Sequence, residues 1–557
     1  MFKPSLSAFV AILVSSASYA AEPPTAGQIL NQIEKSTSLP GLPKVTAPKI
    51  APAIVESISK NGQTILLKGV RFTGNTKLNS ESLLGVIKKF ISQQVSIEDL
   101  ALIADLLTQH YVRSGFLANV TLPEQDITNG VVLFKITEAR LGRLVFNADQ
   151  IAKARVPESF MTQLVEQANP KQALIEMGQI DRSMLLLDDL SSITVGGGLQ
   201  AGQKEGESDL AINIQTDPFF SGSVNIDNFG SRSTGPNRLI LAAAWSSPFS
   251  RGGEIVATAL KTEGTDYGRG AYSFPVGYSG LTGTIQASAL QYDVITETKT
   301  SGDSQTIGAE FNYPYLRSYS QNIYLKGGVT QKFFKNKYAD GTVNSDYDLT
   351  VAEAEIRGNK YIDGVNTEYA VTSKLGYVDL QGSPNYSADQ SGDKTHGRFA
   401  KLAASIKLKM PVQSKLNLTL YGEGQLANKN LDSSEKMYLG GANGVRAYPE
   451  SEGSGTEGIR VAADLEYRLA DNLVGSVFVD GGRVRQNKTN LSGVTGPNMY
   501  SLKGYGFSAT YQGPKQSQMQ AIISRRIGNN PNPTSTGNDQ SGDLKTTRFW
   551  LSVLIPF

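Results

Sequence analysis

The chain has 557 residues, no cysteine, two histidines and a formal net charge of +2 at pH 7. This length exceeds one ordinary domain, and the absence of cysteine excludes disulfide frameworks and thiolate metal sites. The near-neutral charge gives no reason to expect a nucleic-acid-binding protein, because such proteins carry clustered positive charge.

The first twenty residues have the pattern of a secretory signal peptide. Lys3 supplies the positive charge, residues 8–14 are apolar, and Ser-Tyr-Ala at 18–20 gives a small-x-small cleavage site. The apolar stretch is about half the roughly 20 residues that a transmembrane helix needs. We therefore expect residues 1–20 to be removed, with an N-terminal anchor as the alternative. No later segment is apolar enough for a spanning helix, so membrane insertion has to use strands.

Residues 21–62 are expected to form a short helix followed by a Pro-rich linker. The helical pattern covers about residues 25–38, and prolines recur at Pro40, Pro43, Pro48 and Pro52. Such a linker is semi-extended. A helix on a stiff tether can reach a distant site, whereas the alternative is a disordered leader.

Residues 63–216 read as two small α+β domains in series. The first, residues 63–141, has the order β-α-α-β-β. Its expected elements are a strand at 64–72, a helix that starts at the cap residue Asn79, a second helix that opens at 96–99, and strands at 118–122 and 131–137. A looser copy of this pattern covers residues 142–216.

From Asp217 to the end we find no convincing helix and about sixteen strand-like segments, separated by Gly, Asn, Asp and Ser clusters. A strand that crosses a membrane takes about 9–11 residues, so sixteen strands fit, with fourteen or eighteen as alternatives. The last segment alternates and ends at the aromatic Phe557. That ending is typical of a barrel whose last strand pairs with its first.

Two of these segments have one apolar and one charged face. Because successive side chains of a strand point to opposite faces, a membrane barrel places apolar residues toward lipid and polar ones in its lumen. The apolar set is Leu416, Leu418, Leu420, Leu426, Ile459, Val461, Leu465, Tyr467 and Leu469, and the charged set is Arg460, Asp464, Glu466 and Arg468. The charged set either lines a conduction path or cross-links the barrel interior.

Two short runs carry the strongest functional signal. The first is a Gly-rich run with one cation, and it contains Gly440, Gly441, Val445, Arg446 and Tyr448. The second contains Phe478, Asp480 and Gly482. Asp480 lies on the lumen-facing phase of its strand, so Arg446 can meet it inside a barrel and hold its carboxylate with two parallel hydrogen bonds. In the other interpretation each charge is separately hydrated.

Four stretches, taken in order, resemble the two-partner secretion transporters, the TpsB proteins that include haemolysin, filamentous-haemagglutinin and contact-dependent-inhibition secretors. Residues 122–142 resemble the end of the first POTRA domain, and residues 227–232 resemble the first barrel strand. Residues 440–448 resemble the Val-Arg-Gly-Tyr loop motif, and residues 478–482 resemble the Phe-x-Asp-x-Gly strand motif. Ala447 replaces the usual Gly, and Ala tolerates positive φ poorly.

The resemblance implies a Gram-negative outer-membrane barrel of about sixteen antiparallel strands over residues 217–557. It also implies periplasmic POTRA domains at 63–141 and 142–216, and an N-terminal helix that plugs the pore at rest. Residues 430–456, after the eleventh strand, are expected to fold into the lumen. The POTRA domains would capture the unfolded cargo by strand addition.

The implied partners are a large secreted TpsA-type exoprotein (a haemolysin, an adhesin or a contact-dependent-inhibition toxin) and outer-membrane lipid. The barrel assembly machinery is a third, through the C-terminal strand that ends at Phe557. No catalytic residue, metal, cofactor or nucleic acid is expected.

The competing functions are weaker. No Gly-x4-Gly-Lys-Ser/Thr loop and no Gly-x-Ser-x-Gly elbow are present, so neither a nucleotide engine nor a serine hydrolase is indicated. His110 and His396 are too few for a His-rich metal site, and we interpret both as structural or solvated. A hydrolase with lumen carboxylates, an outer-membrane protein insertase and a passive porin are the alternatives. An insertase usually carries more POTRA domains, and a porin does not need residues 63–216.

Overall fold

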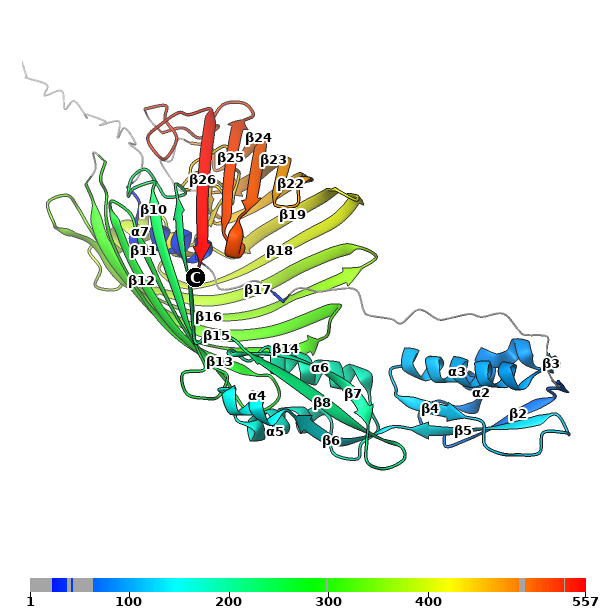
Figure 1. Ribbon diagram of the computed structural model, residues 1–557. Helices are drawn as coiled ribbons and strands as arrows, with labels where there is room; N and C mark the ends of the chain where they lie inside the picture. Colours follow the sequence, from blue (N-terminus) through cyan, green and yellow to red (C-terminus); the bar gives the residue numbers. More distant parts are fainter. Residues whose placement is uncertain (1–22, 38–41, 44–63, 297–298, 490–495, 535) are drawn as a thin grey trace, which may run out of the picture.

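The computed structural model describes residues 23–37, 42–43, 64–296, 299–489, 496–534 and 536–557. The expected signal peptide, the cleavage position and most of the Pro-rich linker lie outside the described residues. The described chain forms one short helix inside a large β-barrel, and two small α+β units outside it (Figure 1). No helix in these ranges is long and apolar enough to cross a membrane.

Sixteen antiparallel strands close into the barrel, which confirms the expected fold class. In barrel order they are β9 (Phe220–Asp227), β10 (Arg238–Ser246), β11 (Glu254–Lys261), β12 (Thr265–Pro275), β13 (Thr282–Asp293), β14 (Ser301–Arg317), β15 (Gln321–Lys337), β16 (Val343–Ile362), β17 (Val365–Asp379), β18 (Gly397–Gln413), β19 (Leu416–Ala427), β22 (Glu457–Ala470), β23 (Leu473–Arg485), β24 (Met499–Gln512), β25 (Gln518–Arg526) and β26 (Thr547–Pro556).

The two faces of the barrel wall follow the alternation of the sequence. Leu426 and Ile459 point outward and are 62% and 56% exposed, whereas Arg460 and Asp480 point inward and are 9% and 2% exposed. An exposed apolar face and a buried charged face are the arrangement that a lipid bilayer requires of a barrel.

The closing seam of the barrel is short. Strand β26 pairs with β9 over five residues, whereas β15 and β16 pair over 17. Just beyond the ladder, the backbone N–H groups of Phe557 and Gly222 each donate to the carbonyl of the other, at 2.9 and 3.0 Å. The C-terminal residue therefore takes part in closing the barrel.

The first α+β unit has a three-stranded sheet in the order β2 (Gly69–Thr73), β5 (Val131–Glu138), β4 (Ala118–Thr121), and a short pair of β1 (Ile65–Leu66) and β3 (Gln94–Val95). Helices α2 (Ser80–Ile87) and α3 (Ile97–Arg113) pack on it, with a 3₁₀ turn at Lys88–Phe90 between them. The expected cap at Asn79 is present, and the structure adds a second cap at Ser96. The Asn79 side chain accepts a hydrogen bond from the N–H of Ser82, and Ser96 forms a capping box with Asp99.

The second unit repeats this plan with the sheet order β6 (Arg140–Phe146), β8 (Glu207–Thr216), β7 (Ile193–Ala201). Its helices are α4 (Ala148–Lys153), α5 (Glu158–Ala168) and α6 (Met177–Asp188). The expected boundary between residues 141 and 142 lies inside β6.

The second unit is attached to the barrel end at which β14 turns into β15 (Figure 1). The Arg317 guanidinium donates to both carboxylate oxygens of Asp189, at 2.8 and 2.9 Å. Arg182 donates to the carbonyl of Pro314 at 2.7 Å, and Ser247 donates to the carbonyl of Arg155 at 2.7 Å. These bonds fix the unit on the barrel rim.

The expectation that no helix follows Asp217 is wrong in one place. A six-residue helix, α7 (Tyr386–Ser391), lies in the loop between β17 and β18, and two 3₁₀ turns, η2 (Ser433–Glu435) and η3 (Pro514–Gln516), lie in other loops. The Asp389 carboxylate accepts bonds from the N–H groups of Thr395 and His396, which hold α7 in place. A helix this short has no apolar periodicity for the sequence to reveal.

Candidate functional site in the barrel lumen

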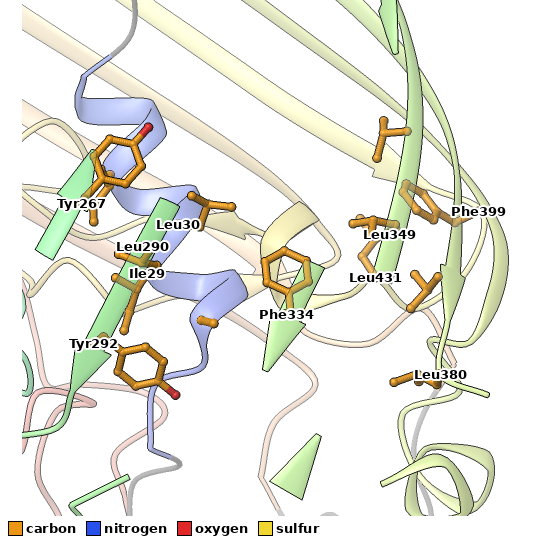
Figure 2. Close-up of a cluster of buried hydrophobic side chains, with 14 of the residues drawn as sticks. Ile29, Leu30, Tyr267, Leu290, Tyr292, Phe334, Leu349, Leu380, Phe399 and Leu431 are labelled. Carbon is orange, nitrogen blue, oxygen red and sulfur yellow. The ribbon is translucent and has the colours of Figure 1, made fainter. Parts of the chain in front are cut away.

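The N-terminal helix α1 (Ala26–Ser36) lies inside the barrel. Its buried face consists of Ala26, Ile29, Leu30 and Ile33, at the i, i+3, i+4, i+7 spacing of an amphipathic helix. Figure 2 shows Ile29 and Leu30 beside the lumen residues Tyr267, Leu290 and Tyr292 of β12 and β13. Burying each Ile or Leu side chain contributes roughly 1.5–3 kcal/mol. This apolar face therefore binds the helix to the lumen wall and still allows it to dissociate.

Polar contacts fix the two ends of α1. The N–H of Ala26 donates to Asn336 on β15 at 2.8 Å, and the Arg238 guanidinium on β10 donates to Ser36 at 3.0 Å. Between them, Asn31 donates to the carbonyl of Ser434 at 2.7 Å. The expected plug helix therefore occupies the lumen and contacts both the barrel wall and the loop that contains Ser434.

That loop, residues 428–456, joins the eleventh and twelfth barrel strands, β19 and β22, and folds into the lumen. We call it the lumen loop. It contains η2 and a small hairpin of β20 (Met437–Tyr438) and β21 (Ser454–Gly455). Leu439, Val445 and Ala447 are fully buried, so the loop has a small apolar core of its own.

Arg446 attaches the lumen loop to two adjacent strands. Its Nε donates to Asp480 on β23 at 2.7 Å, and its two terminal nitrogens donate to the two carboxylate oxygens of Asp464 on β22 at 2.8 and 3.1 Å. The guanidinium also lies 3.3 Å above the centroid of the Phe478 ring. A planar fork with fixed donor directions is required to satisfy both carboxylates at once.

The backbone of Arg446 reaches two further strands. Its carbonyl accepts hydrogen bonds from Ser524 on β25 at 2.6 Å and from the indole N–H of Trp550 on β26 at 2.8 Å. One residue of the loop thus joins four of the last five strands of the barrel.

Ala447 does not adopt the positive φ expected to cause difficulty at this position of the motif. Its side chain is fully buried and faces Gly504 on β24, where an added Cβ would lie 2.7 Å from that of Ala447. The missing side chain at Gly504 therefore provides the space that the Ala447 methyl group needs.

The remaining residues of the two sequence runs form the immediate surroundings of Arg446. Gly441 has a φ of +106°, and an added Cβ there would meet the carboxylate of Glu450. Val445 is fully buried, and the N–H of Tyr448 donates to its carbonyl at 3.0 Å. Gly440 bridges Val445 in the loop, whereas Gly482 on β23 leaves room for the Leu439 side chain.

A second charged cluster, which the sequence did not reveal, lies at the other end of the loop. The Glu435 carboxylate is 1% exposed and lies 2.7 Å from Lys401, 3.2 Å from Lys332 and 3.9 Å from Lys374. Although burial opposes ionisation, these three ammonium groups hold the pKa of Glu435 well below its ordinary value. We call this group the Glu435 cluster.

Two further carboxyl groups of the loop, those of Glu450 and Glu452, differ from Glu435 in that their pKa is raised. Burial raises the pKa of Glu450 and of Glu452 to about 7. Glu452 is fully buried and accepts bonds from Asn530 at 3.1 Å and from the N–H of Gln540 at 2.8 Å. Both groups change charge near neutral pH, in contrast to Glu435.

Most of the expected lumen charges cross-link the wall. Arg460 donates to Glu423 at 2.7 Å and to the carbonyl of Asn443 at 2.7 Å, and Glu466 accepts from Lys409 at 2.7 Å.

His396 accepts a bond from the N–H of Leu380, which makes it structural, as interpreted. His110, on α3 of the first α+β unit, shares a 2.9 Å hydrogen bond with Ser82 on the domain surface. Within the described ranges, no group of three His, Asp or Glu side chains is placed to hold a metal ion.

Comparison with known proteins identifies two matching families along the chain. Residues 206–507 match the haemolysin secretion/activation protein family ShlB/FhaC/HecB, and residues 65–139 match the ShlB-type POTRA domain.

Individual proteins resemble it along most of its length. The heme/hemopexin transporter protein HuxB of Haemophilus influenzae is 24% identical over 516 residues, which are 89% of this chain and 88% of HuxB. The outer membrane transporter CdiB of Escherichia coli strain 536 is 23% identical over 462 residues, 79% of this chain and 76% of CdiB. The solved structure of CdiB from Escherichia coli superposes with a TM-score of 0.70 at 18% identity, and it covers 96% of each chain.

Proposed function

Because the chain belongs to the haemolysin secretion/activation family, a group of outer-membrane transporters for partner exoproteins, we propose that it conducts its partner as an unfolded chain through the lumen that α1 occupies at rest. The barrel lies in the outer membrane and the two POTRA domains lie in the periplasm. Family membership favours secretion over the insertase and porin alternatives.

The observation that carries this proposal is the way in which α1 is bound inside the lumen. The helix is held by four apolar side chains and a few hydrogen bonds, with no strand pairing to the wall. Such contacts are strong enough to close the lumen and weak enough to break without unfolding the barrel. Once the helix leaves, the lumen wall presents polar and charged side chains together with the apolar residues that α1 covered, such as Leu290 and Phe334, and it can accommodate an extended polypeptide of varied sequence.

The POTRA domains supply the capture step in this proposal. Their sheets have the orders β2-β5-β4 and β6-β8-β7, so the strands at the ends of each order present backbone groups to a further strand. Strand addition reads the main chain and tolerates varied side chains, which suits an unfolded cargo. Attachment of the second domain through Arg317 and Asp189 keeps the capture surface beside the barrel mouth.

We assign Arg446 and the residues around it the role of keeping the lumen loop seated while the cargo passes. A loop of this length is costly to order and needs an anchor. The four strands that Arg446 joins give it one.

Two further partners follow from the outer surface. The apolar side chains on the outward face are suited to outer-membrane lipid. The C-terminal strand ends at the exposed Phe557 and closes the seam, so we propose that the barrel assembly machinery recognises this strand. Deleting Phe557 should lower the amount of folded barrel in the membrane more than Phe557→Tyr does.

The test compares export with general barrel assembly in a strain that lacks this protein. We expect the partner exoprotein to accumulate in the periplasm while other outer-membrane proteins keep normal levels. Loss of those proteins would support the insertase alternative instead. Deleting residues 63–216 should abolish export and leave a barrel that still inserts.

A second measurement isolates the plug. Deleting residues 26–36 should raise the conductance of the purified barrel in planar bilayers. Unchanged conductance would contradict the plug and would support the disordered-leader interpretation.

A further inference from the structure

A chain of hydrogen bonds at the barrel mouth ends on the protein's own linker. Asn322 on β15 and Asn359 on β16 are cross-strand partners near the end of the barrel that holds the second POTRA domain. Both side chains point into the lumen side of the wall and are 0% and 2% exposed. Asn359 Nδ2 donates to the backbone carbonyl of Pro43, in the segment between α1 and the first POTRA domain, at 2.6 Å.

From Arg317 to Pro43, each group donates its hydrogen bond to the next in the same direction. Arg317 donates to Asp189 of the second POTRA domain and, through its other terminal nitrogen, to Asn322 Oδ1 at 3.0 Å. The N–H of Ser318 donates to the same oxygen at 3.2 Å, which fixes the orientation of the amide. Asn322 Nδ2 then donates to Asn359 Oδ1 at 3.0 Å. The side-chain N–H of Asn359 is thereby held toward the lumen, two hydrogen bonds away from the Arg317 guanidinium, and aligned hydrogen bonds strengthen one another.

The ligand at the end of this chain is a main-chain carbonyl. Every residue of a polypeptide has one, and proline, which has no N–H, presents it as readily as any other residue. A buried amide that donates to a carbonyl therefore recognises an extended chain without regard to its side chains. Asn359 Nδ2 donates to no other side chain or carbonyl among the described residues, so the departure of the linker would leave this donor available for a new carbonyl.

We propose that Asn322 and Asn359 form a binding site for the main chain of an extended polypeptide at the periplasmic mouth of the barrel, held at rest by the linker at Pro43. When α1 and its linker leave the lumen, the exported chain takes the same site. This second step rests on the proposed function, because it needs an unfolded cargo in the lumen. Asn322 is a positioning residue in this site, and Asn359 is the residue that touches the ligand.

The test follows the linker directly. The chain has no cysteine, so Leu42→Cys in the full-length protein gives a single position for a nitroxide spin label. We expect an immobilised label with the wild-type amides. Asn359→Leu should shift the ratio of immobile to mobile label about tenfold toward mobile, as expected for the loss of one buried hydrogen bond. Asn322→Leu, which leaves Asn359 in place, should shift it in the same direction. Asn366→Leu, on the neighbouring strand β17, is the matched control and should leave the spectrum unchanged.

Competition identifies the ligand chemistry. A synthetic peptide with the sequence of residues 39–52, added in excess, should release the label, and a peptide with the same composition in scrambled order should release it equally well. Release by the native order alone would overturn main-chain recognition. A label that is equally immobile in Asn359→Leu and Asn322→Leu would overturn the site itself.

These outcomes are independent of export. If the label is mobile in the wild-type protein while the partner exoprotein is secreted normally, the site is wrong and the proposed function stands. If the label behaves as expected and the partner is not secreted, the site stands and the proposed function fails.

Discussion

The lumen loop is attached to two different parts of the barrel wall by opposite arrangements of charge, at points that we call the Arg446 end and the Glu435 end. At Arg446, one cation lies between the carboxylates of Asp464 and Asp480, on strands β22 and β23. At Glu435, one anion lies among three ammonium groups, on strands β15, β17 and β18. The plug helix contacts the Glu435 end most closely, since Asn31 donates to the carbonyl of Ser434 at 2.7 Å, whereas Gln32 donates to the carbonyl of Glu450 at 3.4 Å.

The contacts at Arg446 depend on the fixed geometry of one side chain, whereas those at Glu435 are shared among three similar cations. The guanidinium has donors in fixed directions, and each of its contacts uses a different part of the fork, so no other side chain can reproduce them. An ammonium group is a point charge on a flexible stem, and two of them can compensate for a third. We therefore expect the Arg446 end to fail completely when it is changed, and the Glu435 end to fail in steps that first release the plug.

The largest effect is expected from Arg446. Removing one partner of a buried ion pair costs about 3–5 kcal/mol, and lumen water lowers that figure here. Arg446→Ala should abolish most export, and Arg446→Lys should also be defective because an ammonium cannot bridge Asp464 and Asp480. Secreted partner in the medium is the measurement, with Arg468→Ala, an exposed arginine of strand β22, as the control.

A double-mutant cycle makes this prediction quantitative. Arg446→Ala and Asp480→Ala should destabilise the barrel by less together than the sum of their separate effects. Simple additivity would show that the two residues are not coupled and that the loop is held in another way.

The second effect is expected from Glu435→Gln, which leaves three ammonium groups around a neutral amide. Their repulsion should displace η2 and with it the carbonyl that holds Asn31 of the plug, so the channel should open more often in planar bilayers while export is retained. Glu368→Gln, in the exposed pair with Lys407, is the control. A Glu435→Gln channel that stays closed would show that this end does not hold the plug.

The third effect tests the small contact between Ala447 and Gly504. Gly504→Ala places two Cβ atoms 2.7 Å apart, and such overpacking costs typically about 1–3 kcal/mol. Thermal stability of the folded barrel should fall, and Ala447→Gly in the same chain should restore it. Failure of the double variant to recover would mean that the two positions do not share this space.

The fourth effect is a pH dependence that arises from Glu452, which follows Arg446 in the lumen loop. The pKa of Glu452 is raised from 4.5 to about 7 by burial, so the folded protein binds more protons than the unfolded chain in this range. Its contribution to stability is full below about pH 4.5 and is lost as the pH rises to about 7, by at most about 1.4 kcal/mol for each unit. The slope of stability against pH between 5 and 7 should flatten in Glu452→Gln, and an unchanged slope would assign the titration to another group.

The smallest effect is expected from Lys374→Met. Lys374 is the most distant of the three ammonium groups from Glu435, and Lys332 and Lys401 remain. Channel opening should rise far less than in Glu435→Gln. If both variants open the channel equally, the cluster has no redundancy and the contrast between the two ends is wrong.

Alternation along the strands made much of this site predictable. It assigned Asp464 and Asp480 to the lumen, and the two Gly-rich runs placed Arg446 near Asp480. The expectation that Arg446 holds Asp480 with two parallel hydrogen bonds is wrong, because the two terminal nitrogens donate to Asp464 and only Nε donates to Asp480. A periodic pattern says which face a charge lies on and not which loop atom meets it.

The Glu435 cluster could not be predicted from the sequence, for a related reason. Lys332, Lys374 and Lys401 lie on strands that only barrel closure brings around one point, and Glu435 reaches that point through an irregular loop. At Ala447 the sequence shows an unusual residue but does not show what accommodates it. The sequence marks it as a departure from a motif, but the compensating glycine lies 57 positions further on, at Gly504.

The short seam between β26 and β9 has a consequence for how the barrel is made. Its paired residues are about 330 positions apart in the chain. Bringing such distant ends together costs about 5 kcal/mol of chain entropy by the logarithmic dependence on loop length, and the five residue pairs with the bonds between Phe557 and Gly222 have to offset it. The seam should form after the other strand pairs and should break first when the barrel is pulled apart. The bond from Trp550 on β26 to the carbonyl of Arg446 then acts late in biogenesis, since it fastens the last strand only after the lumen loop has reached its final position.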